Sequence, residues 1–411
     1  METTRIAIIG AGAAGCFAAA NIPWSPQREV VVFEKTGKVL QKVKVSGGGR
    51  CNTTHHLFAV ADLIERYPRG KQFLRKTLHV FGPEHTISWF QQRGVRLKAE
   101  SDGRMFPDTD SSQTIIDCIW QEMMKQKVQV RYHKSVVALS KAEEKFVIHF
   151  ADQSSFIADR VLIACGGFPK PEQYQWLKNL GHKIELPVPS LFTFNLSGHP
   201  ITELMGVAVS PVTVKIPGTK IVEQGPVLIT HWGLSGPAVL RASAWGAREL
   251  HDRQYNFQVV VNWLNDVTEA DVRDHFQELR KTHGAQPVGG KNPFGLPRRL
   301  WEFLVVQSGI NHNVRWGELP AKQQQYFLQH LVRHSFQVTG KTTFKEEFVT
   351  CGGISLSGID AKTMQSKSVE GLYFAGEILD VDGITGGFNF QHAWSSAYIA
   401  ARSLSRDEAN S

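Results

Sequence analysis

The stretch Arg5-Ile-Ala-Ile-Ile-Gly-Ala-Gly-Ala-Ala-Gly15 determines the fold of the N-terminal part of the chain. Its apolar first half has the length of a buried strand. Gly10, Gly12 and Gly15 then follow at the spacing of the βαβ dinucleotide-binding fingerprint. Gly10 permits the tight turn, Gly12 lets a pyrophosphate approach the backbone, and Gly15 lets helix and strand pack closely. We expect a helix of small residues to follow, as far as about Asn21.

A second strand and an acidic residue complete this pattern. Glu29–Phe33 is apolar enough to be a buried strand, and Glu34 ends it, 19 residues after Gly15. A carboxylate at this position accepts hydrogen bonds from both ribose hydroxyls and repels a 2′-phosphate. The sequence therefore predicts a site for FAD or NAD rather than for NADP.

Glycine is concentrated in five groups along the chain. Of the 36 glycines, 14 fall in the groups Gly10/Gly12/Gly15, Gly47/Gly48/Gly49, Gly166/Gly167, Gly352/Gly353 and Gly376/Gly383/Gly386/Gly387. Such density is typical of turns with positive φ and of backbone that closely approaches a ligand. Because the groups lie at both ends of the chain, we expect distant segments to form one site.

The second glycine group has polar neighbours. Ser46, Arg50 and Asn52 flank the three consecutive glycines, and Lys42 and Lys44 precede them. This composition indicates a loop whose backbone N–H groups face a ligand, with a flexible surface loop as the alternative.

The remaining pattern distinguishes FAD from NAD. Successive short strands are predicted at Val128–Tyr132, Ser135–Leu139, Lys145–Phe150 and Ser155–Ile157, and the apolar strand Arg160–Ala164 follows them. A β-meander there suits an FAD domain of the glutathione-reductase type, which the chain leaves and later re-enters. Re-entry is predicted by the strand Gly371–Glu377 and by a glycine-rich turn before the helix Gln391–Ser403, whose N-terminus suits the flavin N1–C2=O edge.

Several longer motifs occur in order along the chain. They are SGGGRCN (residues 46–52), GRMFP (103–107), THWGLSGP (230–237), TMQSK (363–367) and the segment Gly371–Ser396. In these motifs the chain resembles a bacterial flavoprotein family, the aminoacetone oxidase-like, BaiN/RdsA-type NAD(P)/FAD-dependent oxidoreductases. Small departures are Cys165, where the family more often has Thr, His392 in place of Trp, and Gln365 in place of Glu.

The resemblance implies an α/β fold: a glutathione-reductase-type FAD-binding Rossmann domain with an inserted β-rich subdomain and a small helical subdomain. We expect the FAD-binding domain at 1–190 plus 346–411 and the inserted domain at 191–345, β-rich in 191–265 and 310–345 and helical in 266–309. The periodicity of the insert predicts strands at Leu191–Leu196, Val207–Ile229, Phe257–Leu264, Phe336–Val338 and Phe344–Val349, and helices at Glu269–Lys281, Pro297–Gln307 and Pro320–His334.

The resemblance also implies the cofactor and the residues around it. The cofactor is FAD, and NAD(P)H is a transient reductant, since no second GxGxxG segment provides a nicotinamide domain. The residues expected at FAD are Gly10, Gly12, Ala13, Ala14, Gly15, Glu34, Lys35, Lys42, Ser46, Gly48, Gly49, Arg50, Cys51, Asn52, Val136, Ala164, Cys165, Gly166, Gly376, Glu377, Asp382, Gly386, Gly387, Phe388 and Asn389.

Charge is unevenly distributed along the 411 residues. The chain carries 46 Lys and Arg against 38 Asp and Glu, a net charge of +8. The steepest excess is Arg66–Lys98, with eight basic residues and only Glu84 against them, whereas 346–411 is acidic. Such a surface attracts polyanions such as ribosomal RNA. The alternative is a solvated face without a partner.

Cysteine and histidine usage excludes several classes of site. The five cysteines are scattered without a CxxC pair, which argues against disulfides, structural zinc and a redox pair and favours a reducing, cytoplasmic compartment. We expect no metal site, and His55–His56 is interpreted as surface loop. The longest apolar stretch, Ile6–Ala20, is too short to span a bilayer.

Two residues are candidate proton donors, and each has a structural alternative. Cys51 lies in the glycine loop, where a buried thiol packed by the cofactor is the other interpretation. His231 precedes a Gly-Leu-Ser-Gly-Pro turn, and a structural hydrogen bond is equally compatible with its position.

Three functions remain open from the sequence. The resemblance implies an FAD-dependent reductase using NAD(P)H, in one version reducing a uridine of large-subunit ribosomal RNA to dihydrouridine. The second is an oxidase or reductase of a small metabolite, such as an aminoketone or an unsaturated ketone. The third is a non-enzymatic flavoprotein that senses redox state.

Overall fold

The structure is a computed structural model and describes residues 3–342 and 349–406. The internal contacts divide the chain into two units, Met1–Pro189 with Lys345–Ser411, and Ser190–Phe344. Each unit is described separately below.

A five-stranded parallel sheet forms the centre of the first unit, in the order β20-β10-β1-β2-β6. Its strands are β1 (Thr4–Ile9), β2 (Arg28–Phe33), β6 (Gln129–Arg131), β10 (Arg160–Ile163) and β20 (Leu372–Phe374). The inner strands are almost wholly apolar because both faces of the sheet are covered. The Rossmann architecture predicted from Gly10–Gly15 is confirmed.

One strand expected in the meander lies elsewhere. The segment predicted at Val128–Tyr132 forms β6, which pairs in parallel with β2. The reason is the preceding helix α6 (Ser112–Lys125), which brings the chain back to the edge of the parallel sheet as a crossover. The antiparallel meander therefore contains only β7 (Val136–Ala142), β8 (Lys145–Phe150) and β9 (Ser155–Ala158).

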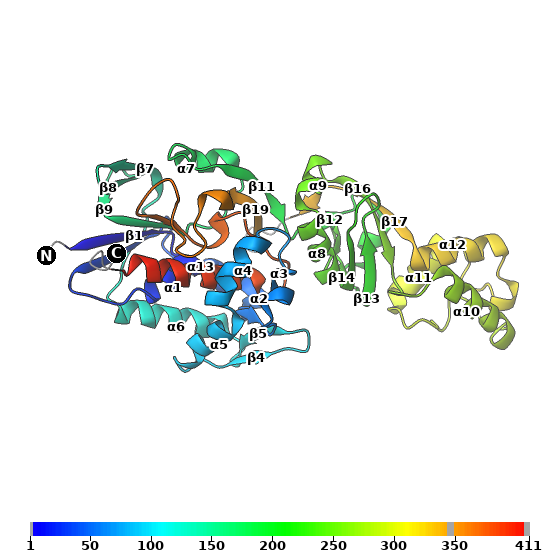
Figure 1. Cartoon of the computed structure of the whole chain (residues 1–411). Helices are drawn as coiled ribbons and strands as arrows, with labels where there is room; N and C mark the ends of the chain where they lie inside the picture. Colours follow the sequence, from blue (N-terminus) through cyan, green and yellow to red (C-terminus); the bar gives the residue numbers. More distant parts are fainter. Residues whose placement is uncertain (1–2, 343–348, 407–411) are drawn as a thin grey trace. The chain divides into compact units, whose positions relative to one another are not determined.

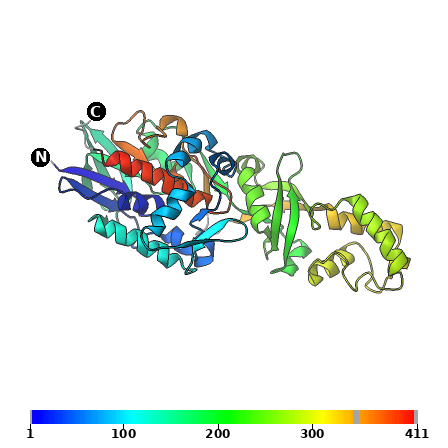
Figure 2. The ribbon, with the colours of Figure 1, turned by 60° about the horizontal axis from the view of Figure 1, so that its bottom comes forward.

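Two helices from opposite ends of the chain lie side by side on the parallel sheet. They are α1 (Ala13–Ala20) and α13 (Phe388–Leu404), and both views show them together, with the meander on the other side of the sheet (Figure 1, Figure 2). The small residues of α1 permit this close approach, and the ring centroids of Phe17 and Trp394 are 5.0 Å apart. The contact brings the N-terminal glycine turn next to the C-terminal segment.

Shorter elements complete the first unit. They are α2 (Gln41–Gly49), β3 (Thr54–His55), α3 (Val60–Ile64), α4 (Lys71–Val80), α5 (Pro83–Gln91), β4 (Leu97–Ala99), β5 (Arg104–Pro107), η1 (Pro171–Tyr174), α7 (Gln175–Lys178), β11 (Ile184–Ser190), β19 (Val349–Ile354), η4 (Leu356–Gly358) and η5 (Gly376–Ile378). Strands β3, β5 and β4 form one antiparallel sheet, and β11 pairs with β19.

A seven-stranded antiparallel sheet forms the β-rich part of the second unit, in the order β17-β16-β13-β14-β15-β12-β18. The strands are β12 (Thr193–Asn195), β13 (Ala208–Lys215), β14 (Val222–Ile229), β15 (Gly233–Ser235), β16 (Asn256–Asn262), β17 (His334–Thr339) and β18 (Lys341–Thr342). Only Gly340 separates β17 from β18, and these two strands pair with opposite edges of the sheet. The sheet therefore closes into a small barrel.

The helices of the second unit differ in part from expectation. They are η2 (Pro200–Leu204), α8 (Pro237–Trp245), α9 (Ala247–Asp252), α10 (Glu269–Thr282), α11 (Arg298–Gln307), η3 (Trp316–Glu318) and α12 (Ala321–Val332). The helical part extends to Val332, so assigning all of 310–345 to the β-rich part was wrong. Helices α8 and α9 were not predicted, and their buried alanines and Leu250 pack against the barrel. Apart from Val349, the strand expected at Phe344–Val349 lies outside the described residues.

Candidate functional site

The segment from the end of β1 into the first turn of α1 can hold only glycine at two of its three glycine positions. A Cβ on Gly10 would lie 2.6 Å from the Ala164 oxygen and from the Cys165 Cα, and one on Gly15 would lie 1.9 Å from the Gly10 oxygen. At Gly12, by contrast, nothing lies within 4 Å of an added Cβ. The backbone N–H groups of the first turn of α1 have no partners within the helix and face this open space.

Glu34 lies at the end of β2, next to this turn. One carboxylate oxygen accepts the N–H of Ala11 at 3.0 Å, and the other accepts both the N–H and the hydroxyl of Thr36 at 2.8 Å. The side chain is almost fully buried. These hydrogen bonds fix the carboxylate beside the α1 N-terminus, where it can still accept ribose hydroxyls.

The second glycine group forms the end of a helix rather than a free loop. Helix α2 leaves helical geometry at Ser46, and Gly47, Gly48 and Gly49 have φ values of 57°, 69° and 85°. A Cβ at Gly48 or Gly49 would meet nothing within 4 Å. Arg50 returns to right-handed geometry with a φ of −97°, and Cys51 has again a positive φ of 63°. The backbone at Gly47 and Gly48 is therefore exposed and has conformations that favour glycine.

The glycine turn before α13 lies against this segment. With its amide oriented to satisfy both neighbours, Asn52 accepts the N–H of Gly387 at 3.0 Å and donates to the Thr54 carbonyl at 3.1 Å. Gly387 is the N-cap of α13 with a φ of 91°, and a Cβ there would lie 2.5 Å from the Thr54 oxygen. Segments some 335 residues apart thus form one wall.

A second contact joins the C-terminal segment to the N-terminal turn. Gly376 has a φ of 77°, and a Cβ there would lie 2.7 Å from the Cβ of Ala14. Its neighbour Glu377 accepts from Lys42 Nζ at 2.7 Å and from the backbone N–H of Thr350 at 2.9 Å. The residues expected at the cofactor therefore come together at the N-termini of α1 and α13. They belong to five separate segments: 10–15, 34, 42–52, 164–166 and 376–389.

These residues fit FAD. The open space over Gly12 and the free N–H groups of α1 suit a pyrophosphate, and the fixed carboxylate of Glu34 suits a ribose. The N-terminus of α13 suits a group that gains negative charge. No cluster of metal ligands occurs in the part of the chain that the structure describes.

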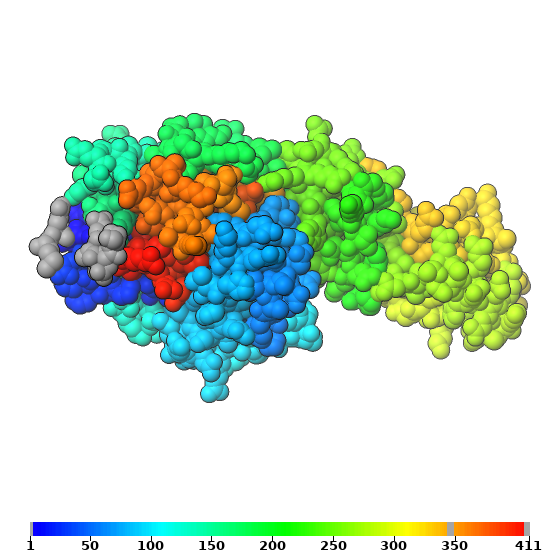
Figure 3. Space-filling model, viewed as in Figure 1, coloured from blue at the N-terminus to red at the C-terminus, as the bar shows by residue number. Residues whose placement is uncertain are grey.

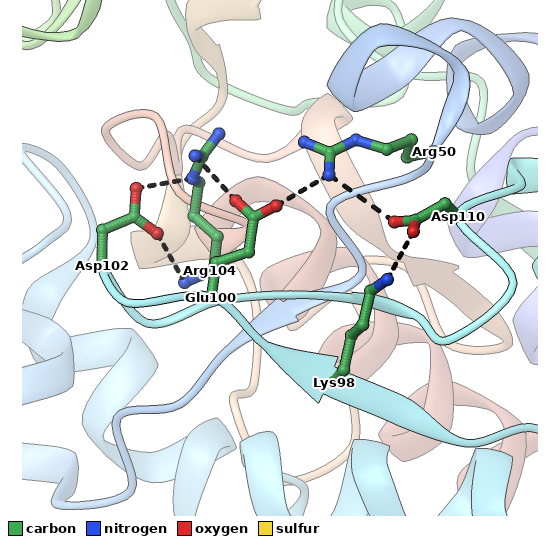
Figure 4. Close-up of polar contacts among 6 residues, drawn as sticks. All are labelled: Arg50, Lys98, Glu100, Asp102, Arg104 and Asp110. Atoms are coloured by element: carbon green, nitrogen blue, oxygen red, sulfur yellow. Dashed lines mark hydrogen bonds and ion pairs between the residues drawn. The ribbon is translucent and has the colours of Figure 1, made fainter.

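Arg50 differs from the other glycine-loop residues, because its guanidinium belongs to a network of three cations and three carboxylates (Figure 4). It lies 2.7 Å from Glu100 and 3.6 Å from Asp110, and 4.0 Å above the Phe106 ring. The network also contains Lys98, Asp102 and Arg104. It connects the glycine loop to β4 and β5, and these ion pairs raise the pKa of Arg50.

Asp382 is also engaged by protein groups. Its fully buried carboxylate receives two hydrogen bonds from the Arg69 guanidinium, one of them 2.5 Å long from Nε. Sequence reasoning placed Asp382 at the cofactor and counted Arg69 among the basic surface residues. The partner was missed because 313 residues separate the two.

The other residues that the sequence predicted at the site differ in burial and in their neighbours. The Cys51 thiol is fully buried, and burial raises its pKa to about 11, whereas burial raises that of Cys165 to about 12. Lys35 is exposed, and Val136 begins β7, paired with Phe150. His231 belongs to the second unit, where it is exposed and its ring lies 4.2 Å from that of Trp232.

Sequence reasoning missed a buried polar group under the site. The hydroxyls of Thr54 and Thr86 donate to the Gln391 side-chain oxygen at 2.6 and 2.9 Å, and the Gln391 amide donates to Ser395 at 3.0 Å. These bonds connect β3 and α5 to α13. The one indication in the sequence was a run of polar residues in an otherwise apolar helix.

A family model described as "HI0933-like protein Rossmann domain" matches residues 4–403. The chain belongs to this family. It is 32% identical to the ribosomal RNA dihydrouridine synthase of Escherichia coli K12, over 98% of each chain. It is 29% identical to the 3-dehydro-bile acid delta(4,6)-reductase of Clostridium scindens, over 97% of this chain and 98% of the relative. The resemblance stated from the motifs is thereby confirmed.

A solved structure shares the fold. It is the 3-ketosteroid-delta4-(5alpha)-dehydrogenase of Rhodococcus jostii RHA1, with a TM-score of 0.51, 12% identity and coverage of 99% of this chain and 98% of that one. The chain is an FAD-dependent oxidoreductase of the HI0933-like family. None of the described helices has the length and apolarity required to cross a membrane.

Proposed function

We propose that this enzyme uses NAD(P)H to reduce a uridine of large-subunit ribosomal RNA to dihydrouridine. The observation that carries the proposal is the similarity, over nearly full length, to two enzymes named ribosomal RNA dihydrouridine synthase. They come from Escherichia coli and Haemophilus influenzae and are 32% and 30% identical to this chain. With a ribosomal substrate the enzyme would act in the cytoplasm, the compartment expected from cysteines scattered without a CxxC pair.

The chemistry is the addition of two hydrogens to a conjugated double bond. The uridine C5=C6 bond is conjugated with the C4 carbonyl, so a hydride adds to C6 and a proton to C5. When bound and reduced by NAD(P)H, FAD supplies the hydride. The bile acid reductase among the relatives is named for the same type of bond, a double bond conjugated with a ketone.

The chain's own residues hold the cofactor and stabilise charge. Gly12 and the α1 N-terminus would bind the pyrophosphate, and Glu34 the adenosine ribose. The segments 46–52 and 386–389 would hold the flavin end, where the α13 N-terminus favours negative charge. The two proton-donor candidates remain Cys51, which is protonated at neutral pH because its pKa is raised, and His231, which is exposed.

The surface charges support an RNA substrate. Four of the eight basic residues in Arg66–Lys98 form ion pairs with carboxylates. The pairs are Arg69 with Asp382, Lys71 with Glu65, Arg93 with Glu122 and Lys98 with Asp110. The other four, Arg66, Arg75, Lys76 and Arg96, are exposed, and they form no ion pair with any residue in 3–342 or 349–406. Unpaired cations of this kind bind phosphates.

The test is complementation of an Escherichia coli strain that lacks its own ribosomal RNA dihydrouridine synthase. Mass spectrometry of nucleosides from the large-subunit RNA should show dihydrouridine restored by the wild-type chain and not by the Gly12→Asp variant, whose carboxylate would repel the pyrophosphate. The proposal would be contradicted if the wild-type chain were soluble and loaded with FAD but the dihydrouridine content stayed at the level of the strain that lacks the synthase.

The purified enzyme separates the alternatives. NAD(P)H oxidation stimulated by protein-free ribosomal RNA supports the RNA substrate, whereas stimulation only by a steroid-like 4-en-3-one supports the small-ketone reductase. Rapid oxidation by O₂ with turnover of an aminoketone supports an oxidase. An FAD-loaded protein that consumes no NAD(P)H with any of these would favour the redox-sensing role.

A further inference from the structure

Two distant segments of the first unit are joined by a buried ion pair. The Arg69 side chain is 13% exposed and that of Asp382 is 0% exposed, and the guanidinium contacts both carboxylate oxygens. A bidentate pair of this kind fixes orientation as well as distance. Because the carboxylate of Asp382 is fully buried, removing the guanidinium of Arg69 would take away a charge that compensates it.

Further contacts surround this pair. The Tyr67 hydroxyl donates to the Phe388 carbonyl at 2.8 Å, and the Arg66 carbonyl accepts the N–H of Ile384 at 3.0 Å. The α3–α4 connection thus holds the segment between Asp382 and Phe388 at three points. Figure 3 shows these parts of the chain, in blue and in orange to red, against one another on one face of the first unit.

The segment that is held leads into the N-terminus of α13. It contains Gly386 and Gly387, with φ values of 135° and 91°. Glycines in such conformations lose much backbone entropy when they are ordered, so the segment depends on contacts from outside it. Those contacts come from Asn52 on one side and from the Tyr67–Arg69 stretch on the other.

We propose that Arg69 is a positioning residue for the flavin. Through Asp382, it fixes the glycine turn that directs the α13 N-terminus at the cofactor. Arg69 is therefore not part of the RNA-binding surface, although it lies in the basic stretch. This inference requires FAD as cofactor and is independent of the substrate, so it holds equally for RNA and for a small ketone.

The experiment compares Arg69→Met, Asp382→Asn, the double variant and Arg69→Lys, with Lys71→Met as the control. Lys71 lies two residues away, and its ion pair with Glu65 is exposed. The readouts are the FAD dissociation constant of the purified apoprotein, the flavin reduction potential, and hydrogen exchange of the first α13 amides without FAD. None of them requires the substrate, so failure of the RNA proposal would leave the result interpretable.

We expect each single neutral variant to weaken FAD binding about tenfold or more and to make the reduction potential more negative. Exchange at the α13 N-terminus should become faster. The double variant should recover part of the affinity because both charges of the ion pair are then removed together, and Arg69→Lys should be intermediate. Lys71→Met should behave as wild type.

Two results would overturn the proposal. One is wild-type FAD affinity and reduction potential in the single variants, even if their thermal stability falls, because the pair would then only stabilise the fold. The other is a double variant no better than the worse single variant, because the two side chains would then not act through each other. If Arg69→Met does not fold, the Arg69→Lys and double variants still decide the question by the same two measurements.

Discussion

At the scale of the residue, the glycines of the first turn have two separable functions. Gly15 allows the helix to approach the strand, since any Cβ there would overlap the Gly10 carbonyl oxygen. Gly12 has free space around its Cα and an ordinary negative φ of −84°. The fold therefore requires glycine at position 15, whereas only the ligand requires it at position 12.

This difference predicts opposite outcomes for two small substitutions. Gly12→Ala should leave the unfolding free energy of the apoprotein within about 0.5 kcal/mol of wild type and should lower FAD affinity about tenfold or more, because the methyl group occupies space that the pyrophosphate needs. Gly15→Ala should destabilise the apoprotein itself by about 1–3 kcal/mol. Urea unfolding and FAD titration of both variants measure these effects. Equal loss of stability in the two would show that position 12 is structural.

His392 makes the stability of the fold around the site depend on pH. Its ring is buried in α13, Nε2 lies 3.2 Å from the Gly376 carbonyl oxygen, and burial lowers its pKa from 6.5 to about 4. Between these two values the unfolded chain binds more protons than the folded one. Stability contributed by the neutral ring is therefore present above pH 6.5 and is lost as the pH falls toward 4, in total by about 3 kcal/mol.

Replacing this ring with one that does not titrate should flatten the pH dependence. We expect the unfolding free energy of wild-type apoprotein to fall more between pH 7 and pH 4.5 than that of His392→Phe, by about 2–3 kcal/mol. The matched control is His79→Gln, an exposed histidine of α4. Parallel pH profiles for wild type and His392→Phe would show that the buried ring does not titrate as described.

Local patterns made part of this site predictable from the sequence. The spacing of Gly10, Gly12 and Gly15 and the position of Glu34 follow from one βαβ unit, so adjacent residues carry the whole pattern. The pairing of Arg69 with Asp382 depends on tertiary contact between remote segments, and residue type alone assigned both to other tasks. Residue type and spacing thus predict partners that are close in sequence and do not reveal partners that are remote in it.

At the scale of the element, α4 has two different faces. Phe73, Leu74 and Leu78 are buried, whereas Arg75 and Lys76 are exposed. The first set stabilises the helix by burying apolar surface. The second contributes nothing to packing and gives the helix a cationic outer face. Stability and surface charge can therefore be changed independently in this helix.

This independence is testable with RNA and salt. Arg75→Gln/Lys76→Gln should bind large-subunit ribosomal RNA more weakly, and the slope of log affinity against log salt concentration should fall by about two. The unfolding free energy should change by less than about 0.5 kcal/mol. The control Lys98→Gln/Lys134→Gln removes two charges already paired with Asp110 and Asp152. If both double variants lose RNA affinity equally, overall charge rather than this helix face is responsible.

The bounds of helices and strands were predicted better than the pairing of each strand with its neighbours in the sheet. The strands β1, β2 and β8 and the helices α10 and α11 lie close to their predicted ranges because each has a clear apolar periodicity. Apolar periodicity does not indicate which strand a segment pairs with. The segment of β6 was therefore predicted in the meander, whereas it follows α6 and pairs with β2 in the parallel sheet. Helices α8 and α9 were not predicted because they lie inside a region whose apolar pattern is mainly that of strands.

At the scale of the whole molecule, each unit has an interior of its own. In the second unit the barrel and the helices share one apolar cluster, which extends from Phe192 to Val338 and includes Trp263 and Trp301. The closing strand β17–β18 and the first strand β12 both belong to Ser190–Phe344. The barrel is therefore complete without any strand of the first unit, and the residues expected at FAD all lie outside it.

A fragment containing residues 190–342 should accordingly fold by itself. We expect cooperative thermal and urea unfolding, with a stability in the range of about 5–15 kcal/mol that is usual for single domains, because the fragment keeps its entire apolar cluster. It should bind no FAD, since the glycine turns of α1 and α13 are absent from it. Circular dichroism measures the transition, and FAD titration of the fragment beside the full chain provides the comparison. A matched fragment ending at Val332 removes β17 and β18, so it should leave the barrel open and unfold without cooperativity. If both fragments unfold cooperatively, closure of the barrel is not what stabilises this unit. If neither does, its folding depends on the rest of the chain.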